Sequence, residues 1–228
     1  MTSLELRPAT RWGLGDVLIT LALYLAVTVG TGYLLVTAGL TGAPAVTIGL
    51  GAGFLVMGGL PLLISVRRGN GPRRDLGLSI RWSDLWMGVL GGVAALLLGG
   101  LVLVLVAVLT GVAPLASPIV DIVAAADPAV LIALTVLTAV VAPLAEEIFS
   151  RGLLWSALVK RGVPAGVTLV LTALLFAVLH LEPTRFGYLV VAGLVLGWLR
   201  LRTGRLGAPI VAHMTVNALP AVSLFLLG

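Results

Sequence analysis

Long uncharged stretches alternate with short clusters of arginine along this chain of 228 residues. A helix needs roughly 20 apolar residues to cross the hydrocarbon core of a bilayer. The uncharged stretches supply about seven such segments, so the pattern predicts an all-α fold, a polytopic membrane helical bundle of roughly six to eight transmembrane helices. We place the seven helices near residues 16–39, 45–66, 84–110, 128–149, 163–181, 186–201 and 207–227.

Glycine and proline set the limits of the third helix. The uncharged run from Leu85 to Val120 is too long for one span, and we expect Gly111, Pro114 and Pro118 to divide it into a helix and a loop. Small-residue pairs such as Gly49 with Gly53 and Gly88 with Gly92 would let helices approach closely. In a chain with 29 glycines we attribute these spacings to chance.

The fourth helix has two possible ends. It can stop near residue 149 or continue past Arg151 to Lys160, which would put the acidic pair Glu146 and Glu147 well inside the membrane. Pro143 should kink this helix just before the pair, because proline removes one backbone hydrogen bond and frees a carbonyl.

Positive charges gather in alternate loops. By the positive-inside rule this alternation predicts a cytoplasmic N-terminus and an external C-terminus. The first apolar run is too long for a cleaved signal peptide, so we expect a retained helix. Arg185 is the one basic residue of the intervening loops, and the basic clusters are Arg7 and Arg11; Arg67, Arg68, Arg73, Arg74 and Arg81; Lys160 and Arg161; and Arg200, Arg202 and Arg205.

The composition agrees with a membrane-embedded chain. With 60% hydrophobic and 10% charged residues, it cannot present an ordinary charged surface to water. We therefore expect one integral membrane domain over residues 1–228, in a bacterial plasma membrane, with the lipid bilayer as its main partner. The arginines form no basic face with interleaved aromatics, so nucleic acid is not an expected partner. The absence of cysteine excludes disulfides, thiolate metal ligands and a cysteine nucleophile.

Against this apolar background, a few ionisable residues are the candidates for chemistry. Ionisable groups within a membrane cost several kcal/mol unless they are paired or hydrated, so a chain that keeps them is expected to hold a reactive centre. Glu147 and Arg151 lie four residues apart, which favours an ion pair on one helix face. Glu146 lies about 100° around the helix and lacks that partner. Both glutamates could instead cap the helix at the membrane interface.

Two further pairs repeat the four-residue spacing. Phe176 and His180 would stack an aromatic ring beside an imidazole, and His213 with Asn217 would aim an imidazole and a carboxamide at one point. Taken singly, a histidine at a helix end such as His180 is more often an interfacial or hydrogen-bonded residue than a catalyst. For His213 and Asn217, interhelical hydrogen bonding explains the spacing equally well.

Together, the motifs EExxxR, FxxxH and HxxxN, in this order, resemble the CPBP family of intramembrane proteases, which includes the CAAX prenyl endopeptidases. The resemblance covers roughly residues 128–220, which we interpret as a CPBP-like catalytic core. This chain has a serine at Ser150, where family members often carry an aromatic residue. The matching stretches are Glu146-Glu147-Ile-Phe-Ser-Arg151, Phe176-Ala-Val-Leu-His180 and His213-Met-Thr-Val-Asn217.

The resemblance implies a polar cavity open toward the cytosol and a set of site residues. Glu146 and His180 would activate a water that attacks a peptide carbonyl. His213 and Asn217 would stabilise the oxyanion or help to hold a metal. Glu147, Arg151 and Phe176 would support these groups.

The cofactor and the activity are left open between alternatives. Glu146, His180 and His213 form a three-ligand set for catalytic zinc, and the same residues suffice for metal-free catalysis with the glutamate as base. We expect an intramembrane endopeptidase acting on a membrane-anchored peptide or protein substrate, including prenylated CAAX-type substrates. The alternatives are a noncatalytic membrane scaffold or immunity protein of the same fold, and a small transporter with a proton relay.

One geometric difficulty accompanies these expectations. Counted at 1.5 Å per residue from the cytoplasmic end, His180 lies roughly 25 Å along the fifth helix, but His213 lies only about 10 Å along the seventh. The two can meet only if the fifth helix begins outside the bilayer, or if the sixth tilts or stops short.

Overall fold

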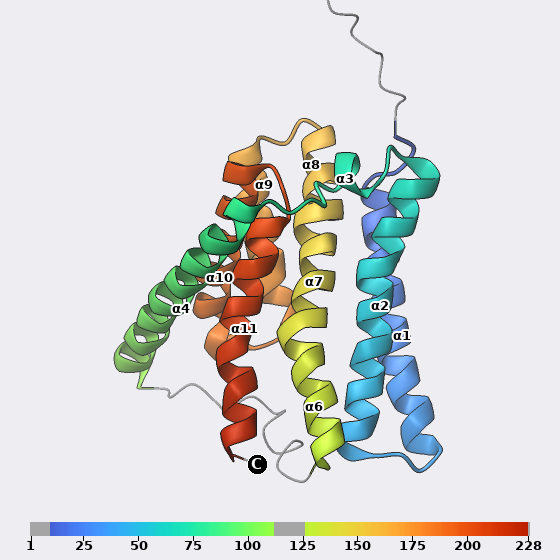
Figure 1. The fold of residues 1–228 in the computed structure, drawn as a ribbon, viewed down its shortest axis with the longest axis vertical. Helices are drawn as coiled ribbons and strands as arrows, with labels where there is room; N and C mark the ends of the chain where they lie inside the picture. Colours follow the sequence, from blue (N-terminus) through green and yellow to red (C-terminus); the bar gives the residue numbers. More distant parts are fainter. Residues whose placement is uncertain (1–9, 112–125, 228) are drawn as a thin grey trace, which may run out of the picture.

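The computed structural model describes residues 10–111 and 126–227, with the backbone alone for 222–227. Every regular element in these residues is helical, which confirms the all-α prediction (Figure 1). The third long helix ends at Thr110, followed by Gly111 in the left-handed conformation that glycine adopts readily. Pro114 and Pro118, expected in the loop that follows, lie outside the described residues.

The elements follow the predicted spans closely. In chain order they are α1 (Leu14–Thr37), α2 (Gly42–Arg68), α3 (Pro72–Asp75), α4 (Trp82–Thr110), α6 (Pro128–Val136), the π-helix η1 (Leu137–Val141), α7 (Ala142–Glu147), the π-helix η2 (Ile148–Leu154), α8 (Trp155–Lys160), α9 (Ala165–Leu179), the 3₁₀ turn η3 (Pro183–Arg185), α10 (Phe186–Thr203) and α11 (Gly207–Leu227).

The predicted polytopic membrane bundle is confirmed. Among the described residues, five helical stretches are long and apolar enough to cross a membrane, and α9 is a shorter apolar helix of 15 residues. Large apolar side chains such as Leu55, Leu97 and Val108 point outward, as expected for a surface in contact with lipid. The chain is an integral membrane protein. The five stretches are Leu14–Thr37, Gly42–Arg68, Trp82–Thr110, Pro128–Lys160 and Pro183–Thr203.

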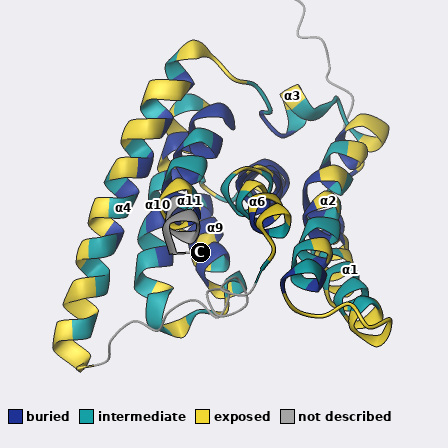
Figure 2. Ribbon diagram, turned by 60° about the horizontal axis from the view of Figure 1, so that its bottom comes forward, coloured by how far each residue is buried: buried dark blue, intermediate teal, exposed yellow. Residues whose placement is uncertain are grey.

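The stretch Pro128–Lys160 forms the central helix of the bundle. The α1–α2 pair lies on one side of it, and α4, α9, α10 and α11 lie on the other (Figures 1 and 2). The helix continues past residue 151 to Lys160, so the longer of its two predicted ends is correct. Its inner side chains, including Leu134, Phe149 and Leu153, form the buried core.

The central helix accommodates Pro143 through a change of helix type. The turn before this proline, η1, is π-helical, and a second π-helical segment, η2, follows the acidic pair. Proline lacks the N–H that a regular α-helix would use, and π-helical turns inside α-helices absorb such irregularities, frequently at functional sites. The disturbance expected at Pro143 therefore takes the form of a π-turn directly before the candidate site.

Glycines let neighbouring helices approach closely, so attributing their spacing to chance was wrong. A Cβ added at Gly92 would lie 2.6 Å from Thr215 Cβ, and one added at Gly88 would lie 2.5 Å from Val211 Cβ. A Cβ added at Gly53 would collide with a threonine of α1. These glycines hold α4 against α11 and α2 against α1, as small residues do in membrane bundles.

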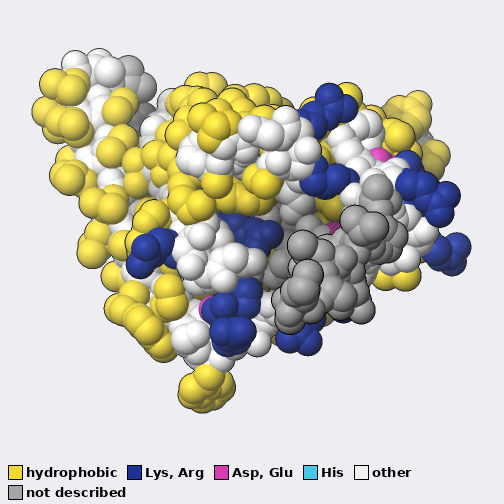
Figure 3. Space-filling model, turned by 90° about the horizontal axis from the view of Figure 1, so that it is seen from above, with side chains coloured by type: hydrophobic (Ala, Val, Ile, Leu, Met, Phe, Trp, Pro, Cys, Tyr) yellow, Lys and Arg dark blue, Asp and Glu magenta, His cyan; other side chains and the backbone are white. Residues whose placement is uncertain are grey.

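Lys and Arg side chains lie on the end of the bundle that is uppermost in Figure 1, where α3 and α8 are labelled, and Figure 3 shows this end from above. Arg7 lies outside the described residues. Asp84 and Arg205 form a double hydrogen bond at this end of the bundle, with N···O distances of 2.6 and 3.1 Å, which joins α4 to the chain entering α11. The pairing with this carboxylate raises the pKa of Arg205. The backbone N–H of Leu206 also donates to the Gly77 carbonyl at 2.9 Å.

This anchoring removes the geometric difficulty over the two histidines. Figure 1 shows that α11 begins below the ends of α8 and α10, so its first turns lie deeper in the bundle than a count from a common surface assumes. His213, two turns into α11, therefore reaches the level of the acidic pair. His180 directly follows the short helix α9 and reaches the same level from the other direction.

The close approach of α4 and α11 generates the first prediction. Gly92→Ala should lower the melting temperature in detergent, by an amount equivalent to about 1–3 kcal/mol, because the added methyl group meets Thr215 and the Ala212 carbonyl. Gly100→Ala is the matched control, since a Cβ at this position of α4 meets nothing within 4 Å. Equal melting temperatures for the two variants would contradict the packing described here.

Candidate active site

A buried ion pair lies at the centre of the site. Arg151 Nη1 donates to Glu147 Oε1 at 2.9 Å, and both side chains are 0% exposed. The pairing that the four-residue spacing predicts is therefore present. Arg151 Nη1 also donates to Ser150 Oγ, and Nη2 donates to the Gly193 carbonyl of α10, both at 3.0 Å. The guanidinium lies 4.9 Å from the centroid of the Phe176 ring.

Gly193 is a member of this network that the sequence did not single out. A Cβ there would lie 2.9 Å from the Ala173 backbone of α9, so the position has no room for a side chain. The close approach of α9 and α10 brings the Gly193 carbonyl within reach of the arginine. Arg200 adds a further tie, because its Nε donates to the Arg151 carbonyl at 3.0 Å.

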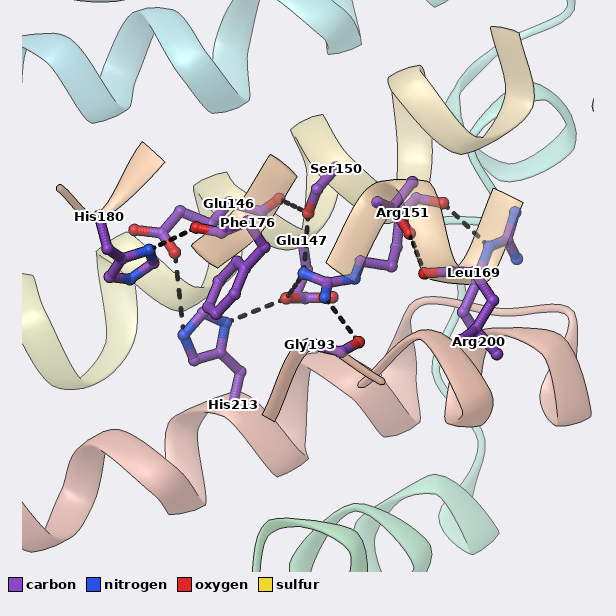
Figure 4. Close-up of polar contacts among 11 residues, drawn as sticks. Glu146, Glu147, Ser150, Arg151, Leu169, Phe176, His180, Gly193, Arg200 and His213 are labelled. Carbon is purple, nitrogen blue, oxygen red and sulfur yellow. Dashed lines mark hydrogen bonds and ion pairs between the residues drawn. The ribbon is translucent and has the colours of Figure 1, made fainter. Parts of the chain in front are cut away.

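His213 joins the ion pair from α11. Its Nδ1 lies 3.0 Å from Glu147 Oε1 in a fully buried contact. A carboxylate can only accept, so Nδ1 carries the proton and Nε2 faces the other way. Nε2 lies 3.8 Å from Glu146 Oε2 (Figure 4). By accepting the Nδ1 hydrogen, Glu147 orients the imidazole so that Nε2 faces Glu146. Carboxylates behind a histidine orient it in this way in many active sites.

Glu146 is the carboxylate that the ion pair leaves free. Its Oε2 is buried and makes no hydrogen bond within the described part of the chain. The 3.8 Å separation from His213 Nε2 is too long for a direct hydrogen bond. It is short enough for one water molecule to contact both atoms.

Phe176 brings the two histidines to one place. The centroid of its ring lies 4.4 Å from that of the His180 ring and 5.4 Å from that of the His213 ring (Figure 4). Both imidazoles therefore pack against the same phenyl ring. His180 Nδ1 lies 2.7 Å from the Phe176 carbonyl. A carbonyl can only accept, so this contact puts the proton on Nδ1 and leaves the lone pair on Nε2.

Asn217 contacts a different partner from the one expected. Its Nδ2 donates to the Thr138 carbonyl in η1 at 2.9 Å, and no described contact joins its amide to Glu146 or His180. The π-turn before Pro143 supplies this carbonyl. In this structure the amide ties α11 to the central helix.

A cavity of about 210 Å³ opens beside Glu146. It lies between the central helix, the α1–α2 pair and α9. Sequence reasoning missed its α1 and α2 wall, because Tyr24 and Met57 belong to no recognisable motif there. Its lining residues are Tyr24, Met57, Glu146, Phe149, Ser150, Leu175, Phe176, Leu179 and His180.

The zinc expectation can be compared with the geometry. A carboxylate and two imidazoles with free Nε2 atoms are suitable donors for zinc. In the described residues, however, no group of three or more such side chains lies close enough together to hold a metal ion.

The buried pair generates the second prediction. Arg151→Ala should destabilise the protein by roughly 3–5 kcal/mol, because it leaves the Glu147 carboxylate buried and unpaired. The effect should appear as a lower melting temperature or reduced expression. Arg185→Ala is the control, since it breaks a partly exposed pair with Glu182 and should cost about 1 kcal/mol or less. An Arg151→Ala variant that melts normally but is inactive would instead assign the arginine a direct role in catalysis.

Comparison with known proteins identifies a family match for the part of the chain that contains most of this site. Residues 128–219 match the family described as type II CAAX prenyl endopeptidase Rce1-like. Neither the curated proteins nor the solved structures contain a significant match to the chain. The matched segment begins with α6 and ends in α11, and it includes the acidic pair and both histidines. The match at residues 128–219 to the Rce1-like type II CAAX prenyl endopeptidase family is consistent with the CPBP resemblance of the motifs.

Proposed function

We propose that this protein is an intramembrane endopeptidase that hydrolyses a peptide bond in a membrane-anchored substrate. One observation carries the proposal: the Glu146 carboxylate, free of the neighbouring ion pair, faces His213 Nε2 at 3.8 Å and shares a cavity with His180. A carboxylate without a charged partner within an apolar membrane bundle costs free energy unless it is hydrated, so its presence there indicates a functional site. Proteolysis of a CAAX-type substrate is the activity that the matched family indicates.

The first chemical step assigns Glu146 the role of general base. A water in contact with its carboxylate gives up a proton to it, while the water oxygen forms a bond to the carbonyl carbon of the substrate. The second hydrogen of this water is donated to the Nε2 lone pair of one of the two histidines, His213 or His180, and this hydrogen bond orients the water. The hydrogen bonds at the two Nδ1 atoms, to the Phe176 carbonyl and to Glu147, support this role because they fix which nitrogen faces the water.

The second step returns the proton. As the tetrahedral intermediate collapses, the carbon–nitrogen bond breaks and protonated Glu146 gives its proton to the leaving nitrogen. The products are a carboxylic acid and an amine, and the carboxylate is regenerated. Burial strengthens every electrostatic interaction along this path, because little water competes inside the bundle.

The substrate is proposed from the surroundings of the site. The cavity walls are mostly apolar, with Met57, Phe149, Leu175 and Leu179 beside the polar groups. These walls suit a peptide that carries aliphatic side chains and reaches the site from the membrane. The basic end of the bundle, which we assign to the cytoplasm by the positive-inside rule, would then define the side from which a lipid-anchored substrate is cleaved. Glu146, His180 and His213 would hold zinc only if they came closer together than they lie in this structure, and the ion would then supply Lewis-acid assistance.

The proposal predicts that Glu146→Gln abolishes most turnover and leaves folding intact. Glutamine keeps the size of the side chain but cannot accept the proton, so cleavage should fall at least about 100-fold. The measurement is cleavage of a quenched prenylated peptide by purified proteins with matched melting temperatures. Glu182→Gln, in the partly exposed pair with Arg185, is the control and should cleave at the wild-type rate.

Two outcomes distinguish the alternatives. Wild-type cleavage by Glu146→Gln would refute the assigned base, and no cleavage by any of the proteins would favour the scaffold. The same assay with a chelator tests the cofactor, since loss of activity that added zinc restores would assign a metal to the histidines.

A further inference from the structure

One polar side chain of the cavity comes from outside the matched segment. Tyr24 lies in the middle of α1, more than 100 residues before the family match begins at residue 128. It lines the same cavity of about 210 Å³ as Glu146 and His180. The sequence gives no sign of this role, because a tyrosine in an apolar helix carries no motif.

Helix α2 holds the Tyr24 ring in position. The ring stacks on Phe54, with centroids 6.0 Å apart and an interplanar angle of 30°. A Cβ added at Gly53 would lie 3.1 Å from Tyr24 Cε2, so the edge of the ring lies against the α2 backbone. None of the hydrogen bonds among the described residues involves the tyrosine hydroxyl. The phenol is thus fixed by packing, while its O–H is available to a ligand.

The other polar groups that line the cavity are already committed. The Ser150 hydroxyl donates to the Glu146 carbonyl and accepts from Arg151. The proton on His180 Nδ1 is engaged by the Phe176 carbonyl, and ionised Glu146 can only accept. Among the described residues that line the cavity, Tyr24 therefore supplies the one hydroxyl donor that no protein group uses.

Peptide hydrolysis needs such a donor. When water adds to the carbonyl carbon, the carbonyl oxygen becomes an oxyanion, and a prearranged hydrogen-bond donor stabilises it strongly in an apolar site. Asn217, which the family resemblance assigns to oxyanion stabilisation, donates one of its amide hydrogens to the Thr138 carbonyl. We propose that the Tyr24 hydroxyl donates a hydrogen bond to the oxygen of the scissile carbonyl and stabilises the oxyanion. This inference rests on the proposed peptidase activity.

The test is Tyr24→Phe, which removes the hydroxyl and keeps the ring packing on Phe54 and Gly53. The value of kcat should fall about 100-fold, as for the loss of one oxyanion donor, while KM changes less than about twofold. Tyr33→Phe is the matched control on the same helix, because Tyr33 is 68% exposed on the outer surface, and its kcat should equal that of the wild type. An unchanged kcat for Tyr24→Phe overturns the inference.

A binding measurement separates this role from a purely structural one. In the inactive Glu146→Gln background, adding Tyr24→Phe should leave the affinity for the quenched peptide within about twofold, since the donor acts mainly in the transition state. A loss of affinity as large as the loss of turnover would contradict that role. Failure of the inference is also distinct from failure of the peptidase proposal. The Tyr24 inference fails if the wild type and Tyr24→Phe are both active while Glu146→Gln is inactive. The peptidase proposal fails if cleavage does not depend on Glu146 at all.

Discussion

The buried pair of Glu147 and Arg151 is the interaction on which the site depends. A guanidinium and a carboxylate that are both 0% exposed are tolerable only when each is paired and hydrogen-bonded. These requirements recruit a carbonyl from α10 at Gly193, an imidazole from α11 at His213 and an aromatic face from α9 at Phe176. One charge on the central helix thereby fixes three other helices around it. The same contacts that keep the pair stable set the positions of the candidate catalytic groups.

The pair also gives the two adjacent carboxylates different roles. Neighbouring residues on a helix point about 100° apart, so Glu147 faces the arginine while Glu146 faces the cavity. Glu147 orients His213 through Nδ1, and the opposite nitrogen of the imidazole faces Glu146 at 3.8 Å. Stability and reactivity thus lie on consecutive residues linked by one histidine. The π-helical segments on both sides of α7 are local irregularities of the kind that often accompanies functional sites.

The sequence could predict what is local or periodic. Apolar run lengths predicted the helices, and the four-residue spacing predicted the pair of Glu147 with Arg151. Contacts between distant segments were not accessible in this way. The bond of His213 to Glu147 joins residues 66 apart, and Asn217 bonds to Thr138 because a π-turn offers its carbonyl. Tyr24 reaches the cavity only through the packing of α1 on α2, which no motif encodes.

A double-mutant cycle on unfolding in detergent tests the central claim that Arg151 pairs with one glutamate and leaves the other free. Glu147→Leu, Arg151→Met and their combination should give a coupling free energy of about 2 kcal/mol or more, because the double variant removes both charges together. The same cycle with Glu146→Leu should give a clearly smaller coupling, because Glu146 reaches Arg151 only through shared neighbours such as His213 and Ser150. Equal coupling of both glutamates to Arg151 would contradict the account.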